Sequence, residues 1–246
     1  MKITVITAVY NRADSIAQAV QSVQTQSWHN VEHVVIDGAS TDGTVQVLLS
    51  CLGARAVWLS EPDSGIYDAL NKGLARSTGD VIGLMHSDDF FADVEVLARV
   101  AAAFADPGVD AVYGDLDYVA KDDTSHIIRR WRSGEYTPAK LARGWMPPHP
   151  TLYLRRSVIK RWGGYDTRYK IAADYDAILR YFGQGKIRAA YVPHVMVKMR
   201  VGGESNRSLA RIWLKSREDY AALRRNGVGG MGALVLKNLG KLGQFF

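Results

Sequence analysis

The stretch Gly79–Asp89, GDVIGLMHSDD, joins an apolar run to two adjacent aspartates. Its apolar part, Val81–Met85, predicts a strand that is buried on both faces. The carboxylates of Asp88 and Asp89 at the end of such a strand repel each other and are costly to desolvate. A divalent cation would remove this conflict, because carboxylate oxygens are hard ligands suited to Mg²⁺ or Mn²⁺. The other interpretation is an aspartate N-cap for a helix near Val94–Phe104.

On either side of this stretch, apolar runs of strand length alternate with segments of helical periodicity. The other predicted strands are Ile3–Val9, Val31–Ile36, Ala56–Leu59 and Ala111–Asp115. The predicted helices are Asp14–Gln26, Thr44–Leu52, Ile66–Arg76 and Val94–Phe104. This alternation is typical of a sheet whose strands are joined by helical crossovers. We therefore expect an α/β fold with a mostly parallel, Rossmann-like central sheet and helices on both of its faces.

Polar side chains follow each of the first four predicted strands. In chain order they lie in Tyr10–Arg12, Asp37–Gly43, Glu61–Gly65 and Asp88–Asp89. Ligands of such sheets bind beyond the carboxyl ends of the strands, so these groups should converge on one edge. A single aspartate at a strand end is usually a cap or turn residue. Four consecutive polar strand ends favour a shared site for a polar ligand instead.

The composition limits the class of protein. The 246 residues, 47% hydrophobic and 23% charged, suit one large α/β domain or a domain with a small appendage. Cys51 is the single cysteine, which excludes an intrachain disulfide and favours a reducing compartment. We find no signal-peptide pattern and no apolar stretch long enough to span a bilayer. These features predict a cytoplasmic protein or one held peripherally on the inner face of the plasma membrane.

The formal net charge is +6, and residues 205–246 contribute much of it, with Glu218 and Asp219 as their only acidic residues. The basic residues there are Arg207, Arg211, Lys215, Arg217, Arg224, Arg225, Lys237 and Lys241. A basic amphipathic helical tail that also carries Trp213 suits an anionic membrane surface. The alternative is a helix docked on the domain with a solvated basic face. Nucleic acid is not an expected partner, because no recognition motif is present.

Several segments, in their order and spacing, resemble the successive motifs of family 2 glycosyltransferases. They are TAVYNRADSIAQAVQSVQTQSW (7–28), VVIDGASTDGT (34–44), NKGLARSTGDVIGLMHSDD (71–89) and GGYDTRYKIAADYDAILR (163–180). The segment SEPDSGIYDALNKG (60–73) is similar to a branch found among bacterial exopolysaccharide and lipopolysaccharide assembly enzymes. The resemblance covers Lys2–Gly203. It implies a GT-A fold in residues 1–204, with a nucleotide-sugar half (1–117) and an acceptor half (118–204), followed by the tail 205–246.

The resemblance also implies which residues bind the nucleotide sugar. Thr7, Val9, Tyr10 and Arg12 would line the nucleotide pocket. Asp37 would accept a hydrogen bond from the base, which favours uracil, since an ionised carboxylate only accepts.

Residues 86–89 occupy the position of the family's DxD motif, with His86 where many members have aspartate. Asp88 and Asp89 would therefore bind Mn²⁺ or Mg²⁺, with His86 and Ser87 beside the donor. The departure at His86 leaves open whether that side chain is a ligand, a ribose contact or a packed residue.

Further donor contacts are implied at three positions. Asp63 and Lys72 would help to hold the nucleotide, although a surface ion pair of Lys72 with Asp68 is the alternative. Arg200 would support the diphosphate after the last predicted strand.

On the acceptor side, Asp174 matches the position of the general base, and Ala173 replaces a glutamate that many members carry. Asp174 also suits a helix N-cap. Asp176 would point away from Asp174 on a helix, and we assign it to the acceptor side. His149 joins it there, in a stiff turn that contains Pro147, Pro148 and Pro150.

The implied reaction is a single displacement with inversion at the anomeric carbon. Asp174 would take a proton from an acceptor hydroxyl on a glycan or a lipid-linked glycan, in cell-surface polysaccharide synthesis. A sugar nucleotidyltransferase and a non-catalytic nucleotide-sugar-binding protein are the alternatives. The first would have a glycine-rich signature where this chain reads TAVYNRADS. A nicotinamide oxidoreductase is disfavoured, because G-x-G-x-x-G does not follow the first strand.

Overall fold

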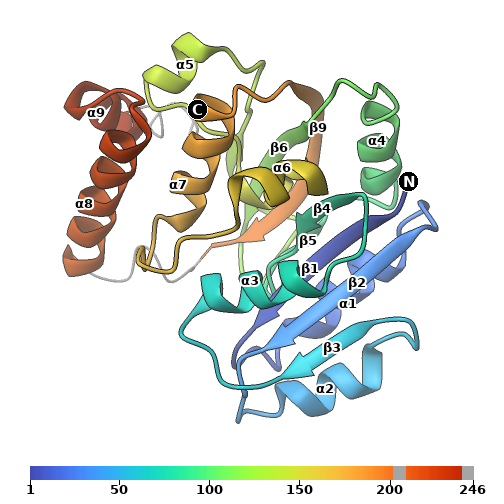
Figure 1. Ribbon diagram of the computed structural model, residues 1–246. Coiled ribbons are helices and arrows are strands. Elements are labelled where there is room, and N and C mark those ends of the chain that lie inside the picture. Colours follow the sequence, from blue (N-terminus) through green and yellow to red (C-terminus); the bar gives the residue numbers. More distant parts are fainter. Residues whose placement is uncertain (202–208, 240–246) are drawn as a thin grey trace.

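The computed structural model describes residues 1–201 and 209–239 (Figure 1). The strands are β1 (Ile3–Val9), β2 (Val31–Asp37), β3 (Val57–Ser60), β4 (Val81–Leu84), β5 (Phe90–Phe91), β6 (Ala111–Val119), β7 (Ile127–Trp131), β8 (Tyr153–Arg155) and β9 (Ala189–Arg200). The helices are α1 (Ile16–Gln24), α2 (Thr44–Cys51), α3 (Ile66–Arg76), α4 (Val96–Ala103), α5 (Pro138–Ala142), α6 (Arg156–Trp162), α7 (Ala173–Ile178), α8 (Leu209–Asn226) and α9 (Met231–Leu239).

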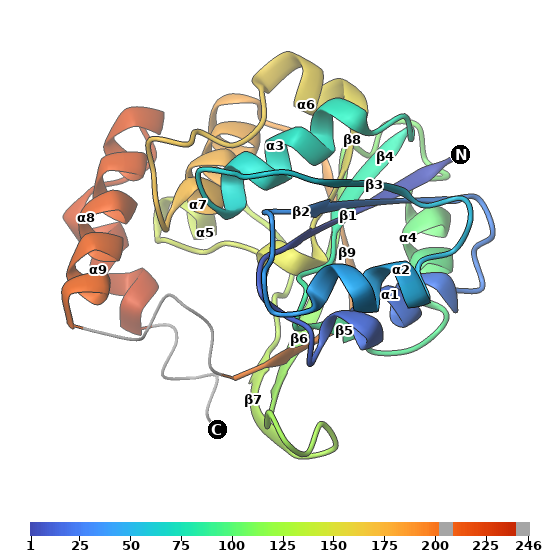
Figure 2. The ribbon, with the colours of Figure 1, turned by 90° about the horizontal axis from the view of Figure 1, so that it is seen from below.

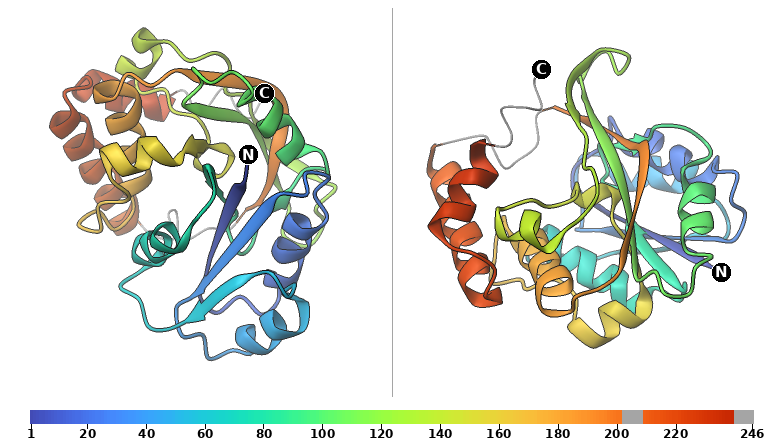
Figure 3. Two further views of the ribbon diagram at one scale, coloured as in Figure 1. Left: turned by 45° about the vertical axis from the view of Figure 1, so that its right-hand side comes forward. Right: turned by 90° about the horizontal axis from the view of Figure 1, so that it is seen from above.

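One sheet joins the strands in the order β3-β2-β1-β4-β8-β6-β9-β5, with β7 paired to β6. From β3 to β4 all neighbours are parallel, as the alternation of strands and helices predicts. Beyond β4 the sheet is mixed: β8 runs antiparallel to β4 and β6, whereas β9 runs parallel to β6. The parallel half is therefore the part that carries the predicted strand-end residues, and the sheet curls beyond it (Figure 3).

Helices cover both faces of the parallel half, with α3 and α6 on one side and α1 and α2 on the other (Figure 2). Successive side chains of a strand point to opposite faces. Accordingly Ile3 and Val5 of β1 pack in the core that includes α1 and α4. Ile6 and Ala8 pack in the core that includes α3. Burial on both faces explains why β1 is mostly apolar, with Thr4 and Thr7 as its only polar residues.

At the amino end of β2, opposite to Asp37, the carboxylate of Glu32 organises a polar cluster. Its side chain is 7% exposed and accepts hydrogen bonds from Lys2 Nζ (2.6 Å), Thr4 Oγ1 (2.7 Å) and the Thr78 backbone N–H (2.7 Å). Burial raises the pKa of the Glu32 carboxyl, but the bonds from Lys2, Thr78 and Thr4 outweigh it and lower the pKa to about 2. Glu32 therefore supports the fold at the end of the sheet away from the predicted site.

The C-terminal helices α8 and α9 lie beside α7 (Figure 1). Ala222, Leu223, Ala233 and Leu234 are buried in the same core as Tyr175 of α7. This matches the docked-helix alternative for the tail. Its residues 205–208 and 240–246, which include Arg207 and Lys241, lie outside the described residues. Within residues 1–201 and 209–239, no helix is both long and apolar enough to cross a membrane.

Candidate functional site

The loops after β1, β2 and β4 meet at one edge of the sheet, as the strand-end rule predicts. The Asn11 backbone N–H donates to Ser40 Oγ (2.8 Å), and Ser15 Oγ donates to the Ser87 carbonyl (3.0 Å). Asn11 (φ 50°) and Ala39 (φ 61°) adopt left-handed backbone conformations in these loops. Such conformations are unfavourable for residues other than glycine and gather at functional sites. Backbone strain and loop convergence thus coincide at this edge.

The carboxylate of Asp37 is fully buried. It accepts hydrogen bonds from the Ser40 backbone N–H (3.0 Å), Ser40 Oγ (2.5 Å) and Ser60 Oγ (2.6 Å). A carboxylate offers about four acceptor positions, so most of its capacity is used within the protein. In this structure Asp37 fixes the loop after β2, and its contact with a base stays a prediction.

Thr7 and Val9 differ from the sequence expectation, because both side chains are buried in the sheet. Thr7 Oγ1 lies 3.0 Å from Nε2 of His33 on β2. The odd-numbered residues of β1 face the core between the sheet and α1. The side chains of Thr7 and Val9 therefore do not reach the surface of the site. Of the residues predicted to line the nucleotide pocket, Tyr10 is exposed and Arg12 is partly exposed.

Asp63 lies beside this surface. A side chain at Gly38 would collide with Asp63 Oδ2 and would also contact the Tyr10 ring. The other carboxylate oxygen, Oδ1, accepts from the Gly65 backbone N–H (2.8 Å). Tyr10, Gly38 and Asp63 therefore lie against one another beside this edge of the sheet.

Lys72 is paired within the protein. Its Nζ lies 2.9 Å from Glu61 and 3.8 Å from Asp68, and it donates to the Pro62 carbonyl (2.7 Å). The hydrogen bond to Glu61 raises the pKa of Lys72. The ion pair with Asp68, given above as the alternative, is thus present. In this arrangement Lys72 holds the loop after β3.

Asp88, Arg12 and Arg200 lie together at the end of β4. Asp88 is 34% exposed, and its Oδ2 lies 3.9 Å from Nε of Arg12. The Arg200 guanidinium donates to the Asp88 carbonyl and to Gln18 Oε1. A partly exposed carboxylate near Arg12, with the Arg200 guanidinium on the backbone of the same residue, can bind a cation and an anionic ligand side by side.

Asp89 is buried beneath this group. The Arg200 backbone N–H donates to its Oδ1 (3.1 Å), whereas its Oδ2 has no hydrogen-bond partner. Burial, and next the charge of Asp88, raise the pKa of the Asp89 carboxyl. The resemblance implies that Asp89 binds the metal, but its side chain is buried in this structure.

No group of three His, Cys, Asp or Glu side chains is arranged to hold a metal in the described parts of the chain. The partly exposed carboxylate of Asp88 could nevertheless bind a hard cation. Mg²⁺ is commonly held by one or two carboxylates together with substrate phosphates and water.

Asp174 lies in the first turn of α7, one residue after the helix begins, so it is not the N-cap. Tyr67 Oη on α3 lies 3.2 Å from Asp174 Oδ1 and donates to the Ile171 carbonyl (2.6 Å). The Tyr67 hydroxyl thus links α3 to the start of the helix that carries Asp174. Nothing in the sequence indicates that Tyr67 contributes to the site, although it lies within the segment SEPDSGIYDALNKG.

His86 is partly buried near residues from distant parts of the sequence. Burial lowers the pKa of His86, while the nearby charges of Asp88 and Asp174 act in the opposite direction. Its ring centroid is 6.0 Å from that of His149. His149 Nε2 lies 2.8 Å from Tyr165 Oη, and burial lowers the pKa of His149 to about 4. Asp88, His86, His149 and Asp174 therefore belong to one neighbourhood.

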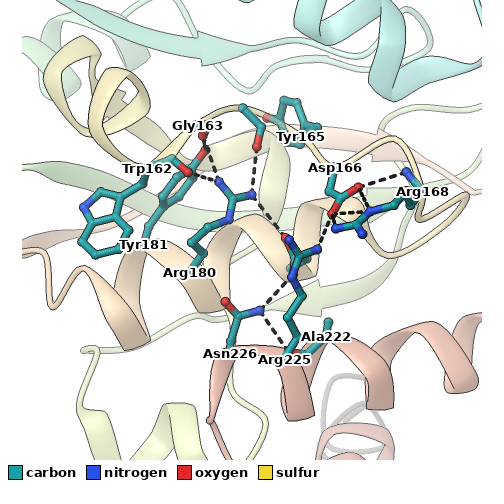
Figure 4. Close-up of polar contacts among 12 residues, drawn as sticks. Trp162, Gly163, Tyr165, Asp166, Arg168, Arg180, Tyr181, Ala222, Arg225 and Asn226 are labelled. Atoms are coloured by element: carbon teal, nitrogen blue, oxygen red, sulfur yellow. Dashed lines mark hydrogen bonds and ion pairs between the residues drawn. The ribbon is translucent and has the colours of Figure 1, made fainter.

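Asp176 is held inside the protein, and its assignment to the acceptor side stays a prediction. It is almost fully buried. Its Oδ1 accepts from Asn226 Nδ2 (2.9 Å), and its Oδ2 lies 3.2 Å from Arg180. Arg180 also donates to the carbonyls of Gly163 and Gly164, and Figure 4 shows this network. Two residues along a helix turn a side chain by about half a turn, so Asp176 faces α8 while Asp174 faces Tyr67.

The sequence was compared with known proteins. The family model described as "Glycosyl transferase family 2" matches residues 4–162. A Mycobacterium tuberculosis protein described as an uncharacterized glycosyltransferase is 34% identical over 187 residues, which cover 72% of this chain and 68% of the relative. A PGL/p-HBAD biosynthesis glycosyltransferase of the same species is 30% identical over 222 residues, which cover 86% and 82%.

Solved structures share the fold. TarS 1–349 of S. aureus in complex with UDP-GlcNAc has a TM-score of 0.68 at 19% identity, and the match covers 93% of this chain and 66% of that one. The mannosyltransferase PcManGT of Pyrobaculum calidifontis, in complex with GDP-Man and Mn²⁺, has a TM-score of 0.66 at 20% identity, with 98% and 69% covered. The chain spans 39% of a longer TarS chain. The likeness shows the GT-A fold.

Proposed function

The chain belongs to glycosyltransferase family 2, and we propose that it moves a sugar from a nucleotide diphosphate sugar to a hydroxyl of a glycan or lipid-linked acceptor. One geometric observation supports this proposal: the His86 ring, two residues before Asp88, lies 6.0 Å from the His149 ring, and His149 and Asp174 line the same cavity. A donor-binding carboxylate and a candidate base thus lie in the same neighbourhood. A non-catalytic binding protein would have no need of the second.

The reaction is an inverting displacement. The Asp174 carboxylate accepts the proton of the acceptor hydroxyl as that oxygen bonds to the anomeric carbon, and the bond from this carbon to the diphosphate breaks. The Tyr67 hydroxyl lies 3.2 Å from Asp174 Oδ1 and holds the loop before Asp174 through the Ile171 carbonyl. Holding both substrates in line supplies much of the remaining rate.

The nucleotide sugar would bind at the carboxyl edge of the parallel half of the sheet. Asp88 would hold a divalent cation, Mn²⁺ or Mg²⁺, which neutralises charge on the departing diphosphate when bound. Arg12 lies near the Asp88 carboxylate, Arg200 contacts the Asp88 carbonyl, and Ser87 contributes to the same loop. Tyr10 offers an exposed ring to the base, and Asp63 a carboxylate beside it. We favour uracil as the base, and TarS, with the same fold, is solved with UDP-GlcNAc.

Product analysis tests this function. We expect the protein, with Mn²⁺ and one of UDP-glucose, UDP-GlcNAc or GDP-mannose, to release the nucleoside diphosphate slowly by transfer to water. Release should depend on the cation. Pyrophosphate release from a nucleoside triphosphate and a sugar 1-phosphate would support a nucleotidyltransferase instead. Donor binding by calorimetry without any release would support a binding protein.

We also propose that the outer face of α9 contacts an anionic membrane surface near a lipid-linked acceptor. Ala233 and Leu234 face the core, whereas Met231, Val235 and Leu239 are each more than half exposed. The exposed positions recur every four residues and form one stripe along the helix. The basic residues of the C-terminal helices supply charge complementary to anionic lipids.

Serine substitution of this stripe tests the membrane contact. The variant Met231→Ser/Val235→Ser/Leu239→Ser should bind vesicles of phosphatidylglycerol and phosphatidylcholine at least about tenfold more weakly, because it loses the apolar area that would insert. Co-sedimentation is the measurement. Leu49→Ser, at an equally exposed apolar position on α2, is the matched control. Equal sedimentation of the triple variant and the wild type would reject the contact.

A further inference from the structure

We propose that Glu218 on α8 is a positioning residue for Asp174, which makes the C-terminal helices a structural part of the active site. This inference rests on the proposed role of Asp174 as the base. Glu218 is one of the two acidic residues in a basic segment, and it does not contact the donor side. Its carboxylate is instead turned toward the loop that leads into α7.

The Glu218 carboxylate binds consecutive backbone N–H groups. Its Oε1 accepts from Lys170 (2.9 Å), and its Oε2 accepts from Ile171 (2.8 Å) and Ala172 (3.0 Å). The side chain is 7% exposed, so water cannot readily replace it. These donors immediately precede α7, which has no side-chain cap of its own. Glu218 of α8 thus supplies the hydrogen-bond acceptors and negative charge that stabilise the start of α7.

The same loop connects to Asp174 through Tyr67. The Ile171 N–H donates to Glu218, and the Ile171 carbonyl accepts from the Tyr67 hydroxyl. That hydroxyl also lies 3.2 Å from Asp174 Oδ1. The peptide groups on both sides of Ile171 are therefore fixed, one by α8 and the other by α3. Asp174 follows three residues later, so its position depends on both anchors.

Other contacts hold α8 on α7 independently of Glu218. Asp219 pairs with Lys237 of α9 (2.8 Å), and Lys237 Nζ lies 3.2 Å from the centroid of the Tyr175 ring. Asn226 Nδ2 donates to Asp176 Oδ1 (2.9 Å). Loss of the Glu218 carboxylate should therefore loosen the loop 170–172 while α8 stays docked. This separates an effect on the base from an effect on folding.

The substitution Glu218→Gln is the test. A glutamine keeps the size of the side chain but replaces one acceptor oxygen with an NH₂ group, which opposes the backbone N–H donors. We expect kcat for donor turnover to fall about tenfold, while the Kd for UDP with Mn²⁺ stays within twofold of the wild type. Initial rates give kcat and equilibrium binding gives the Kd, and both are measured well below the melting temperature.

Glu32→Gln is the matched control, because Glu32 is equally buried and accepts four hydrogen bonds at the far end of the sheet. It should lower the melting temperature without lowering kcat. An unchanged kcat in Glu218→Gln, or equal losses of kcat in both variants, would overturn the positioning role.

Asp174→Asn separates this inference from the proposed function. If Asp174→Asn is inactive and Glu218→Gln is fully active, only the inference fails. If Asp174→Asn keeps its turnover, the base lies elsewhere and the proposed mechanism fails with it.

Discussion

Asp174→Asn is expected to lower kcat by about 10³-fold while leaving donor binding nearly intact. An amide cannot accept the proton of the acceptor hydroxyl, and general base catalysis contributes about 10²–10⁴-fold. The substitution keeps an oxygen for the Tyr67 hydroxyl, which lies 3.2 Å from Asp174 Oδ1, so the loop before α7 should keep its shape. Calorimetry with UDP and Mn²⁺, together with initial rates of nucleoside diphosphate release, measures both quantities.

Asp176→Asn is the control for this substitution. Asp176 lies on the same helix but is buried against Arg180 and Asn226. Its replacement should reduce stability and leave kcat close to the wild-type value below the melting temperature. If both variants lost activity equally, α7 would contribute through its packing alone and Asp174 would not be the base.

Much of the fold follows from the sequence, because its first half is built from local patterns. The apolar runs of β1 and β2 and the periodicity of α3 are legible from a few neighbouring residues, and right-handed crossovers then fix the parallel order. The rule that ligands bind beyond carboxyl strand ends also brings Arg12, Asp37 and Asp88 to one edge correctly. The predicted bounds of α3, Ile66–Arg76, match the structure.

The rest of the site depends on partners far away in the sequence. Nothing near Asp37 indicates that Ser60 would occupy its carboxylate, and nothing near Asp176 points to Asn226. A strand pattern predicts that Thr7 alternates with Ile6, but not that His33 would pair with its hydroxyl inside the core. In the second half of the sheet, β8 and β9 follow long connections. Residues near these strands do not indicate whether each runs parallel or antiparallel to its neighbours.

The second large effect is expected at Asp88, where Asp88→Asn should abolish the increase in donor affinity that Mn²⁺ provides. Asp88 is the accessible carboxylate of the 86–89 segment, since Asp89 is buried with a raised pKa. A neutral amide is a poor ligand for a hard cation. We expect kcat to fall about 10²–10³-fold, in line with the loss of one strong electrostatic contact to a leaving group. Calorimetric titration of UDP in Mn²⁺ and in EDTA measures the affinity difference.

The titration in EDTA distinguishes a cation site from a general loss of binding. Without metal, Arg12 and Arg200 remain next to residue 88, and removing the Asp88 charge would reduce the repulsion on a bound diphosphate. The variant should therefore bind UDP in EDTA at least as tightly as the wild type. Asp93→Asn, at a carboxylate of similar exposure that pairs with Arg99 and His194, should keep the full response to Mn²⁺. A normal Mn²⁺ response in Asp88→Asn would show that the cation is held without Asp88, and the donor site would then have to be built on the arginines alone.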